Sequence, residues 1–431
     1  METKLERIAE ISATTKKPEF TALYHHINYE LLKKCHKELD GKKAVGIDKV
    51  TKDEYEQNLD ANLKDLVYRL KTRAYKPLPS LRVWIPKANG KLRPLGIASY
   101  EDKIVQLALK KVLEAIYEPR FLPWMCGFRP NKGCHDAIKA TWSCINTGRI
   151  HYIVDADIKG FFDHIDHDWM MKFVSLYIKD PNILWLINSY LKAGVIDNKT
   201  YNATEEGTAQ GNIISPILAN IYMHNVLVLW YRFAIKENFK GANFLVVYAD
   251  DFIAGFELES EAKQYYELLK ERMNRFNLEL EESKSRLIAF SKWICVDNER
   301  KGLPKPETFD FLGFTFYSSK TRKGMPTVKV MTASKKLRLK LIEMKKWLYE
   351  NRTMPIHELI KAMNRKLVGH YNYYGVSFNS IRLQTFLHFS QKYLYKVLNR
   401  RSHKRSYTSE QFMEFLKYCP LARPHVKVKL Y

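Results

Sequence analysis

Two adjacent carboxylates, Asp250 and Asp251, lie between two apolar runs of the chain and are its first candidates for chemistry. The runs, residues 244–248 and 252–256, are rich in Val, Ile and Phe, which predicts a β-hairpin with the carboxylates at its turn. This turn lacks the Asn-Gly or Asp-Gly that hairpins prefer. Neighbouring negative charges repel, and a hard divalent cation such as Mg²⁺ is the simplest partner that offsets the repulsion. On this stretch alone, a solvated Asp-Asp turn is the simpler interpretation.

A third carboxylate, Asp157, changes that balance because it also ends an apolar segment, residues 152–157. If this segment and the hairpin are neighbouring antiparallel strands, Asp157, Asp250 and Asp251 meet at one sheet edge and can hold two metal ions. Two metal ions stabilise the attacking and the leaving oxygen of a phosphoryl displacement. The pattern therefore predicts nucleotidyl transfer to a primer 3′-hydroxyl.

Basic and polar residues that could serve phosphate groups lie in three other segments. Lys87 and Arg93 flank a tight turn between apolar strands, which suits a clamp on a triphosphate, although an exposed basic hairpin is an equally good interpretation. Lys284, in a turn before another strand, is a candidate general acid for a pyrophosphate leaving group. Gln210 and Gly211 precede an apolar helix, at a point where the backbone can approach a ligand closely.

Both helices and strands are needed to position these residues. Residues 1–75 show helical spacing of their apolar side chains, and Ser215 is expected to cap an apolar helix that runs to about Phe233. Helical spacing resumes from Thr332. Strand patterns occupy residues 81–86, 91–97, 152–157, 244–256 and 309–316, the last bent at Gly313. The mixture predicts an α+β fold.

The charge of the chain is concentrated at its C-terminal end. The formal net charge is +24, and residues 318–431 carry 25 Lys and Arg against 5 Asp and Glu. Residues 1–317 are nearly neutral, with 46 against 42. In the basic quarter Lys and Arg alternate with aromatic residues, among them Trp347, Tyr373 and Tyr393. Because bases stack on aromatic rings while cations follow phosphates, this quarter is expected to bind nucleic acid.

Other sequence features bear on the compartment. The N-terminal residues lack the basic and apolar pattern of a signal peptide, and no apolar run approaches the length of a membrane span. The six cysteines form no Cys-x-x-Cys pair, which argues against a zinc ribbon. A reduced, intracellular environment is the expectation.

Six ordered blocks of the chain resemble the reverse transcriptases encoded by bacterial group II introns, the reverse transcriptase/maturase family. The resemblance extends over nearly the whole chain, because the C-terminal segments Gly369-His-Tyr-Asn-Tyr-Tyr-Gly375 and Leu421-Ala-Arg-Pro424 resemble the family's thumb, or maturase, region. The six blocks are Ile85-Pro-Lys with Arg93-Pro-Leu-Gly-Ile97, Gly127-Phe-Arg-Pro130, Asp155-x-Asp-x-x-x-Phe-Phe-Asp163, Gln210-Gly with Ser215-Pro-x-Leu-Ala-Asn220, Tyr248-Ala-Asp-Asp251 and Phe311-Leu-Gly-Phe314.

This resemblance implies roles for individual residues. The three carboxylates would be the catalytic ligands of two Mg²⁺ ions, with Mn²⁺ as an alternative. Phe162 matches the position whose ring lies under the sugar C2′ and excludes a ribonucleotide 2′-hydroxyl, which favours dNTPs. Leu312 and Gly313 match a hairpin that grips the primer end.

Two departures from the family pattern bear on the function. Ala209-Gln-Gly-Asn212 stands where the family usually has Pro-Gln-Gly-Gly, and Ile97-Ala98 where it has Ile-Pro. The first departure lies beside the expected nucleotide, so it bears on backbone geometry, rate and fidelity. Alternatives to an active polymerase are a splicing maturase with little polymerase activity and a domesticated reverse transcriptase in phage defence or repair.

The resemblance also implies the domain organisation and the partners. It implies a right-hand polymerase with fingers and an antiparallel-sheet palm in residues 1–317, of which 1–80 form an N-terminal helical extension. Residues 318–431 would form a basic helical thumb, or maturase, domain. The protein would bind its intron RNA to assist splicing and copy it into DNA during retrohoming, with dNTPs, an RNA template and a DNA primer or target as partners. The expected location is the cytoplasm of a bacterium, with association to RNA or the nucleoid. Neither a membrane partner nor a particular oligomeric state is implied.

Overall fold

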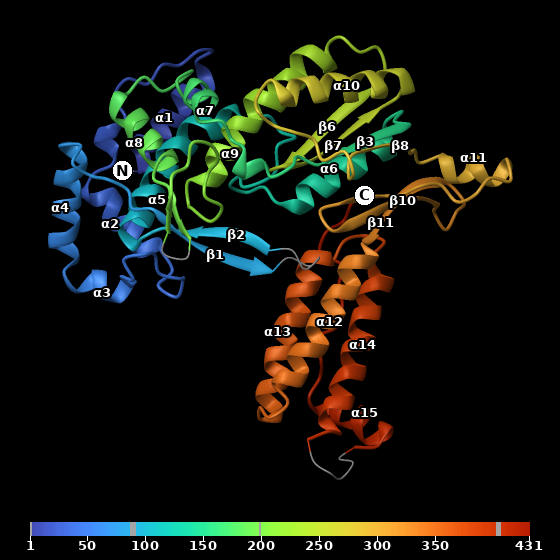
Figure 1. Cartoon of the computed structure of the whole chain (residues 1–431). Helices are drawn as coiled ribbons and strands as arrows, with labels where there is room; N and C mark the ends of the chain where they lie inside the picture. Colours follow the sequence, from blue (N-terminus) through green and yellow to red (C-terminus); the bar gives the residue numbers. More distant parts are fainter. Residues whose placement is uncertain (1, 87–91, 198–199, 402–406) are drawn as a thin grey trace.

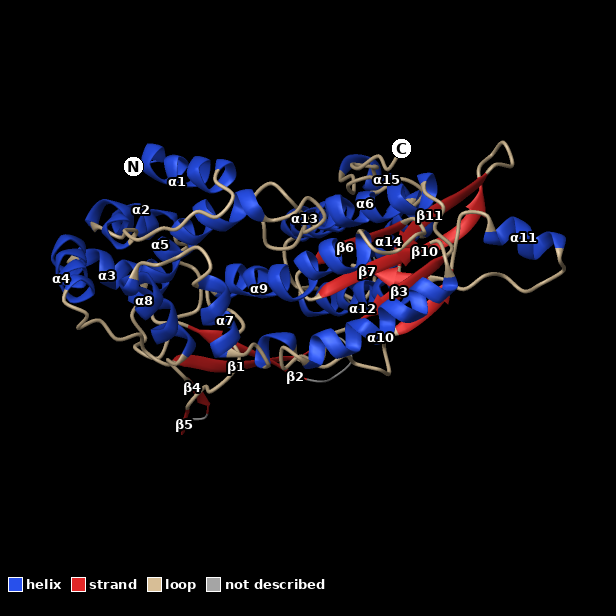
Figure 2. Cartoon of the chain, turned by 90° about the horizontal axis from the view of Figure 1, so that it is seen from above, coloured by secondary structure: helices blue, strands red, loops and turns tan. Residues whose placement is uncertain are grey.

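The computed structural model describes the chain except residues 1, 87–91, 198–199 and 402–406 (Figure 1). The described part forms a curved body of helices and sheets, from which a bundle of helices projects as an arm (Figures 1 and 2). The combination of helices with largely antiparallel strands confirms the predicted α+β class. No helix of the described residues is both long enough and apolar enough to span a membrane.

Helices fill the N-terminal part of the body, as the spacing of residues 1–75 predicts. Asn28 caps one of them by accepting a hydrogen bond from the Leu31 backbone N–H at 3.1 Å, and Thr51 and Glu54 form a capping box at another. Their buried leucines pack around the long helix α5. The helices are α1 (Glu2–Thr14), α2 (Tyr29–Glu38), α3 (Lys52–Gln57), α4 (Leu59–Lys71) and α5 (Tyr100–Tyr117).

A small sheet lies beside these helices. Its hairpin pairs β1 (Ser80–Pro86) with β2 (Leu92–Ile97), and β1 also pairs in parallel with β4 (Val195–Asp197), which pairs with β5 (Thr200–Asn202). The described strands are therefore in the order β2-β1-β4-β5. The two strands of the hairpin are those that the alternating pattern predicts.

The central sheet has the strand order β6-β7-β3-β8, and its described pairs are antiparallel. Side chains alternate between two cores, since Val154 belongs to one and its neighbour Ile153 to the other. Helix α10 (Glu259–Asn274) packs on the first face, and α6 (Cys134–Thr147) on the second. The strands are β3 (Tyr152–Ala156), β6 (Asn243–Tyr248), β7 (Asp251–Phe256) and β8 (Arg286–Ala289).

A third sheet joins the central sheet to the arm. It contains β9 (Phe309–Phe311), β10 (Phe314–Lys320) and β11 (Pro326–Thr332). Residues 318–332 are therefore mostly strand, and the helices of the arm begin after them, as the helical spacing from Thr332 predicts. Val328 and Val330 belong to the same core as Phe314 and Phe316 of β10.

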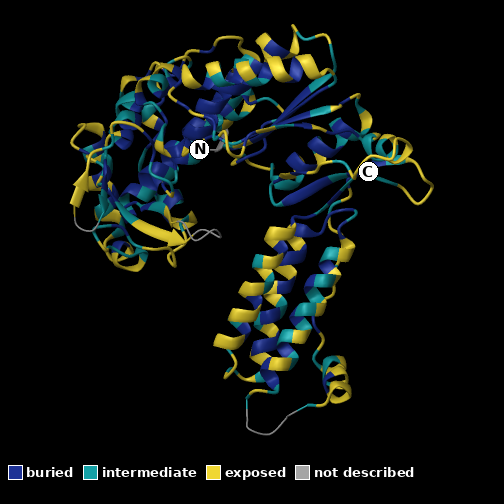
Figure 3. Ribbon diagram, turned by 45° about the vertical axis from the view of Figure 1, so that its right-hand side comes forward, coloured by how far each residue is buried: buried dark blue, intermediate teal, exposed yellow. Residues whose placement is uncertain are grey.

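The C-terminal arm consists of α12 (Ser334–Glu350), α13 (Ile356–Tyr374) and α14 (Ser380–Leu398), with α15 (Ser409–Tyr418) near its far end. Residues coloured as buried lie on the helix faces turned toward the inside of the arm, and exposed residues lie on its outer faces (Figure 3). In α12 the buried residues Leu337, Met344 and Leu348 keep the spacing of one helical face.

Several shorter elements connect these parts, namely α7 (His167–Val174), α8 (Pro181–Leu191), α9 (Ser215–Met223), α11 (Ile294–Arg300) and 3₁₀ turns at Tyr24–His26, Glu118–Arg120 and Phe161–Asp163. π-Helical turns at His224–Val228 and Tyr231–Lys236 follow α9. Ser215 is the first residue of α9 rather than its cap, because its Oγ donates instead to the Ala209 carbonyl at 2.9 Å.

Candidate active site

Tyr248 and Asp251 form the last pair of the β6–β7 hairpin, so Ala249 and Asp250 form its turn. Ala249 has φ +58°, a left-handed conformation that costs a non-glycine residue about 1–2 kcal/mol. Gly127 packs directly against this turn, because a Cβ on Gly127 would lie 2.3 Å from the Ala249 nitrogen. The Gly127 carbonyl accepts a hydrogen bond from Asn220 Nδ2 at 2.8 Å. Contacts from other elements therefore hold the turn in its strained form.

Asp157 directly follows β3, and the register of β3 and β7 brings it to the same edge. The last recorded pair is Ala156 with Phe252, so one further step places Asp157 opposite Asp251. Lys284, in the turn before β8, donates to Asp157 Oδ2 at 2.5 Å. The structure thus brings Asp157, Asp250, Asp251 and Lys284 together, as the sequence predicts for strand ends on one sheet.

The carboxylates at this edge perturb one another. Desolvation, followed by the charges of Asp250 and Asp157, raises the pKa of Asp251 to about 7, although this side chain keeps access to solvent. Burial raises the pKa of Asp155 to about 6 even though Arg286 lies 3.5 Å away. The hydrogen bond to Asp157 is the main cause that raises the pKa of Lys284, so its ammonium form is favoured.

Carboxylate oxygens of this kind are the donors that Mg²⁺ prefers. The raised pKa of Asp251 is the direct sign that these carboxylates share one electrostatic environment. Within the described residues, however, no three His, Cys, Asp or Glu side chains are gathered closely enough to hold an ion. Lys284 Nζ lies against Asp157 instead. The carboxylate oxygens of this edge are suitable ligands for a divalent cation. In this structure the Lys284 ammonium group balances part of their negative charge.

The Gln-Gly segment packs against strand β2. Arg93 Nε donates to Gln210 Oε1 at 2.7 Å, and the Gly96 backbone N–H donates to the Gln210 carbonyl at 2.5 Å. Gly211 has φ +110°, and a Cβ there would lie 2.5 Å from the Gly96 carbonyl oxygen. Arg93 and the Gln210-Gly211 segment, which were predicted separately as parts of a nucleotide site, are therefore in contact with each other. Lys87, the other predicted phosphate ligand, lies outside the described residues.

The departures from the family pattern in this segment are accommodated by neighbouring residues. Asn212 is buried, and its Oδ1 accepts a hydrogen bond from Ser80 Oγ at 3.1 Å. Ala209 faces Gly96, which has no side chain to oppose it. The substituted residues thus have partners, and Gly211 keeps the positive φ that its approach to β2 requires.

Phe162 lies in the 3₁₀ turn after β3 and is only 6% exposed. Its ring packs edge-on against Phe161 at 5.3 Å and against Phe128 at 6.5 Å between centroids. The Thr208 backbone N–H donates to the Phe162 carbonyl at 2.8 Å. Phe162 and Gln210 line one cavity of 260 Å³, which places the predicted sugar-discriminating residue beside the Gln-Gly segment.

The Leu312-Gly313 turn between β9 and β10 is held by Tyr373, which the sequence indicates as a base-stacking aromatic residue but not as a contact of this turn. Both turn residues have positive φ, +50° at Leu312 and +80° at Gly313. Tyr373, near the end of α13, donates its hydroxyl hydrogen to the Leu312 carbonyl at 3.0 Å. The Tyr373 carbonyl accepts a hydrogen bond from His135 Nε2 of α6 at 2.7 Å. The tyrosine-rich motif around Tyr373 indicates an important segment. It does not show that Tyr373 contacts Leu312 and His135, which lie far away in the sequence.

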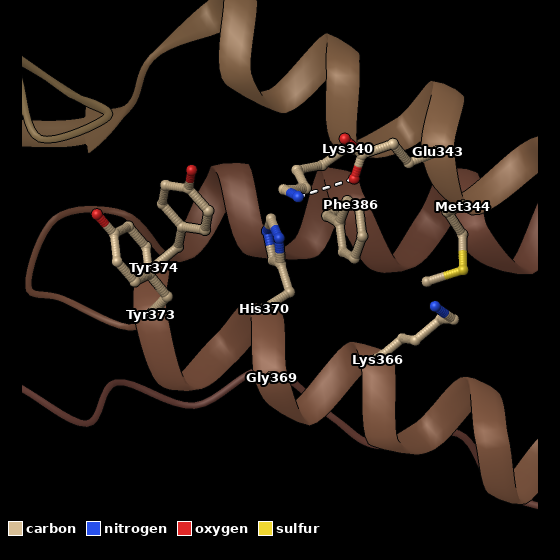
Figure 4. Close-up of a pocket in the computed structure, with 9 residues that line it drawn as sticks. All are labelled: Lys340, Glu343, Met344, Lys366, Gly369, His370, Tyr373, Tyr374 and Phe386. Carbon is tan, nitrogen blue, oxygen red and sulfur yellow. Dashed lines mark hydrogen bonds and ion pairs between the residues drawn. The ribbon is translucent and has the colours of Figure 1, made fainter. Parts of the chain in front are cut away.

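A cavity of 450 Å³ lies next to this contact in the C-terminal arm (Figure 4). His370 stacks on Phe386 in its wall with 3.7 Å between ring centroids. Burial lowers the pKa of His370 to about 4, so the ring is neutral at pH 7. Lys340, which is hydrogen-bonded to Glu343 at 2.8 Å, and Lys366 also line the cavity. The cavity therefore combines aromatic rings with ammonium groups.

Comparison with known proteins adds independent evidence. Residues 85–316, more than half of the chain, match the family model described as reverse transcriptase (RNA-dependent DNA polymerase). The matched segment contains the central-sheet carboxylates, the Gln-Gly segment and the Leu312-Gly313 turn.

Relatives include proteins named for introns. The chain is 38% identical to the group II intron-encoded protein LtrA of Lactococcus lactis subsp. cremoris over 52% of its own length and 37% of that protein. It is 36% identical to protein YkfC of Escherichia coli (strain K12) over 49% of its own length and 63% of that protein. It is also 32% identical to nuclear intron maturase 1, mitochondrial, of Arabidopsis thaliana over 22% and 13% of the respective chains. The match to the Lactococcus protein thus spans little more than a third of that protein.

Proposed function

The chain belongs to the reverse transcriptase (RNA-dependent DNA polymerase) family, and from that premise we propose that it extends a DNA primer along an RNA template. The similarity to group II intron-encoded proteins confirms the resemblance drawn from its motifs. The observation that carries the proposal is the register of β3 and β7, which sets Asp157 opposite Asp251 beside Lys284.

In this proposal, Asp157, Asp250 and Asp251 hold Mg²⁺, which when bound neutralises charge on the primer terminus and on the triphosphate. Desolvation, together with the charges of Asp250 and Asp157, raises the pKa of Asp251, so a divalent cation would compete with the proton for this carboxylate. Lys284 stays protonated beside Asp157 and is placed to give a proton to the departing pyrophosphate. Losing that proton would leave Asp157 without its ammonium partner.

The nucleotide would bind between β2 and the 3₁₀ turn after β3. Arg93 is oriented by its hydrogen bond to Gln210, and a guanidinium held in this way suits the oxygens of a phosphate group. Phe162 is fixed by the rings of Phe161 and Phe128, so it cannot easily yield to a 2′-hydroxyl. We therefore infer a preference for dNTPs.

In terms of the right-hand architecture, the central sheet would be the palm, and the N-terminal helices with the β1–β2 hairpin the fingers. The C-terminal arm would be the thumb, whose helices begin at Ser334 within the predicted region 318–431. The Leu312-Gly313 turn would hold the primer end, with Tyr373 linking it to the thumb.

Primer extension tests the proposal. We expect the full chain with Mg²⁺ and dTTP to extend oligo(dT) on poly(rA), and Asp157→Asn or Asp250→Asn to reduce the rate more than about 100-fold by removing a metal ligand. Asp168→Asn, an exposed carboxylate on α7, is the matched control and should retain activity. Product from the wild-type chain no greater than from Asp250→Asn would refute the polymerase function.

A second candidate function is that of a splicing cofactor with little polymerase activity. It is favoured by the name of the Arabidopsis relative, an intron maturase, and by the basic C-terminal quarter. The same extension assay separates the two, because a scaffold without chemistry gives no product. Folded intron RNA encoded around the gene would support mobility by retrohoming, whereas its absence would favour recruitment to host work such as phage defence or repair.

A further inference from the structure

A cavity of 470 Å³ lies at the base of the β1–β2 hairpin, outside the candidate active site. Three parts of the chain form its walls, namely the segment between α4 and β1, helix α8 with the residues that follow it, and strand β5. Among the described residues, none lines both this cavity and the cavity of Phe162 and Gln210. The side chains on which the argument depends are Arg73, Lys76, Trp185, Lys192 and Tyr201.

Three cations line the cavity, and no Asp or Glu of the described residues does. Arg73 Nε donates to Asn182 Oδ1 at 2.8 Å, which orients the guanidinium group. Arg73, Lys76 and Lys192 form no ion pair with any other described residue. They belong to residues 1–317, in which 46 Lys and Arg nearly balance 42 Asp and Glu. The basicity of the C-terminal quarter therefore does not explain this cluster, whose charge an anionic ligand would balance.

Two accessible aromatic rings accompany these cations. Tyr201 is 54% exposed, and its ring lies close to Gly194, because a Cβ on that glycine would be 2.5 Å from the ring. Trp185 of α8 is partly buried. A nucleobase can stack on such rings while its phosphates meet the neighbouring cations. The volume of the cavity also falls within the range of about 300–1,000 Å³ that is usual for small-molecule sites.

The arrangement of the charge distinguishes between two kinds of anionic ligand that carry a base. A nucleoside triphosphate has its negative charges on consecutive phosphate groups, whereas a nucleic-acid strand has one phosphate on each nucleotide. Guanidinium and ammonium groups both bind phosphate oxygens. Because three cations surround one cavity of this size, they favour a free nucleotide over a strand.

The wall of the cavity continues into elements of the candidate active site. Pro79, which lines the cavity, directly precedes Ser80, the first residue of β1. The Ser80 backbone N–H donates to the Gly194 carbonyl at 3.1 Å, and Ser80 Oγ donates to Asn212 Oδ1 at 3.1 Å. A ligand in the cavity would therefore restrict the base of the hairpin that carries Arg93.

We propose that this cavity binds a free nucleoside polyphosphate, which acts as an effector of the β1–β2 hairpin. The three cations hold the phosphate groups, and the rings of Trp185 and Tyr201 contact the base. The binding site does not depend on the proposed polymerase function, whereas the effector role rests on it. A merely solvated basic surface would require neither the accessible rings nor a cavity shared by three parts of the chain.

The binding test uses the full chain with its active site occupied. An oligo(dT)/poly(rA) hybrid with a dideoxy-terminated primer is saturated with dTTP and Mg²⁺, and ATP does not pair with this template. Fluorescence anisotropy then measures binding of ATP that carries a fluorophore on its ribose. We expect Arg73→Gln/Lys192→Gln and, separately, Tyr201→Ser to weaken binding about tenfold, through lost phosphate contacts and lost stacking respectively. The matched control, Lys17→Gln/Lys64→Gln, removes two exposed charges outside the cavity and should bind as the wild type does.

Unlabelled competitors identify the class of ligand. ATP should displace the labelled nucleotide at least about tenfold more effectively than tripolyphosphate does, because only ATP has a base to stack on the rings. Equal displacement by tripolyphosphate, or stronger displacement by U12 RNA, would overturn the assignment to a free nucleotide. Equal loss of affinity in the control variant would overturn the assignment to this cavity.

Primer extension tests the effector role. With free Mg²⁺ held constant, ATP should change the KM for dTTP at least about twofold in the wild type and leave it unchanged in Arg73→Gln/Lys192→Gln. Unchanged melting temperatures would exclude misfolding of this variant. The same KM with and without ATP in the wild type would overturn the effector role. Absence of extension by every variant would count only against the polymerase, because the affinity for ATP is measured without extension.

Discussion

Asp251 is the residue at which the electrostatics of the site can be measured most directly. Its pKa rises from 3.8 to about 7 in the folded chain, so the folded state binds this proton more tightly than the unfolded state does. The stability contributed by the group is therefore fully present below about pH 4 and is lost as the pH rises through about 7. Metal binding should strengthen over the same interval, because the proton and the cation compete for one carboxylate.

Asp251→Asn should abolish the loss of stability that the wild type shows as the pH rises through about 7. In EDTA at pH 8 we expect the melting temperature to rise by about 1–2 °C, a modest change because solvent reaches the side chain and screens the repulsion. At pH 4 the variant and the wild type should melt together. Differential scanning fluorimetry at the two pH values checks this, with Asp168→Asn as the control. The same shift at both pH values would show that the repulsion has been misassigned.

Phe162 offers a second test at the scale of one side chain. Phe162→Ala opens space beside Gln210, so we expect the ratio of rUTP to dTTP incorporation on poly(rA) to rise at least about tenfold. The substitution also removes a buried ring at a cost of about 3–5 kcal/mol, so melting must be recorded in parallel. Phe233→Ala removes a 56% exposed ring that does not line this cavity and is the matched control. Unchanged sugar selectivity in Phe162→Ala would remove the steric role.

The sequence predicts the positions and contacts of some functional residues but not of others. Asp157, Asp250 and Asp251 end or interrupt apolar strands, and strands of one sheet share an edge, so their convergence followed from the pattern. Lys284 could be placed in a turn, but its carboxylate partner depends on the pairing of β3 with β8. Tyr373 could be placed among the aromatic residues of the basic quarter, but its contact with Leu312 could not be predicted, because helical periodicity does not specify which distant turn its hydroxyl will reach.

At the scale of elements, the Asp250–Asp251 hairpin depends on the loop that contains Gly127. We expect Gly127→Ala to push a methyl group into the Ala249 backbone, at a cost of about 1–3 kcal/mol, and to lower the primer-extension rate about tenfold or more by moving the turn. Gly369→Ala is the matched control, since a Cβ there meets nothing within 4 Å and should be tolerated. Equal activity of the two variants would show that the loop does not position the turn.

Tyr373 links three elements, α13, the β9–β10 turn and α6. Tyr373→Phe keeps the ring stacked on Phe314 at 5.8 Å but loses the hydrogen bond to Leu312. We expect the KM for primer–template to rise about three- to tenfold with little change in kcat, because the turn would hold the primer end less firmly. His135→Ala, which removes the bond to the Tyr373 carbonyl, should act in the same direction. A fall in kcat alone would argue against a positioning role.

Elements with strong periodicity were predictable and their boundaries were not. The β1–β2 hairpin and the N-terminal helices follow from alternating or helical spacing. The helix that begins at Ser215 was expected to run to about Phe233, but α9 ends at Met223 and π-helical turns follow it. In the basic quarter, β10 and β11 continue to Thr332, from where helical spacing was expected, because charge indicates a partner surface rather than a secondary structure.

At the scale of the whole molecule, the uneven charge of the sequence corresponds to two different parts of the structure. The nearly neutral residues 1–317 form most of the curved body, and the strongly basic C-terminal quarter includes the projecting arm (Figure 1). The sequence could assign that charge to the C-terminal quarter but not to particular faces of the arm. Lys340 and Lys366 line the cavity of Figure 4. Lys345, Lys346, Lys396 and Arg400 line a groove of 460 Å³ between α12 and α14, and this division depends on how the three helices pack.

The two sides of the arm should differ in how salt weakens binding. If the side with Lys340 and Lys366 contacts the primer–template, each lost phosphate contact lowers the slope of log affinity against log salt by about one. We therefore expect Lys340→Gln/Lys366→Gln to reduce this slope by about one to two for an oligo(dT)/poly(rA) hybrid, measured by anisotropy between about 50 and 200 mM salt. Lys396→Gln/Arg400→Gln removes the same charge from the groove and should leave the slope for this hybrid unchanged. The opposite outcome would place the primer–template on the α14 side of the arm and exchange the roles of its two surfaces.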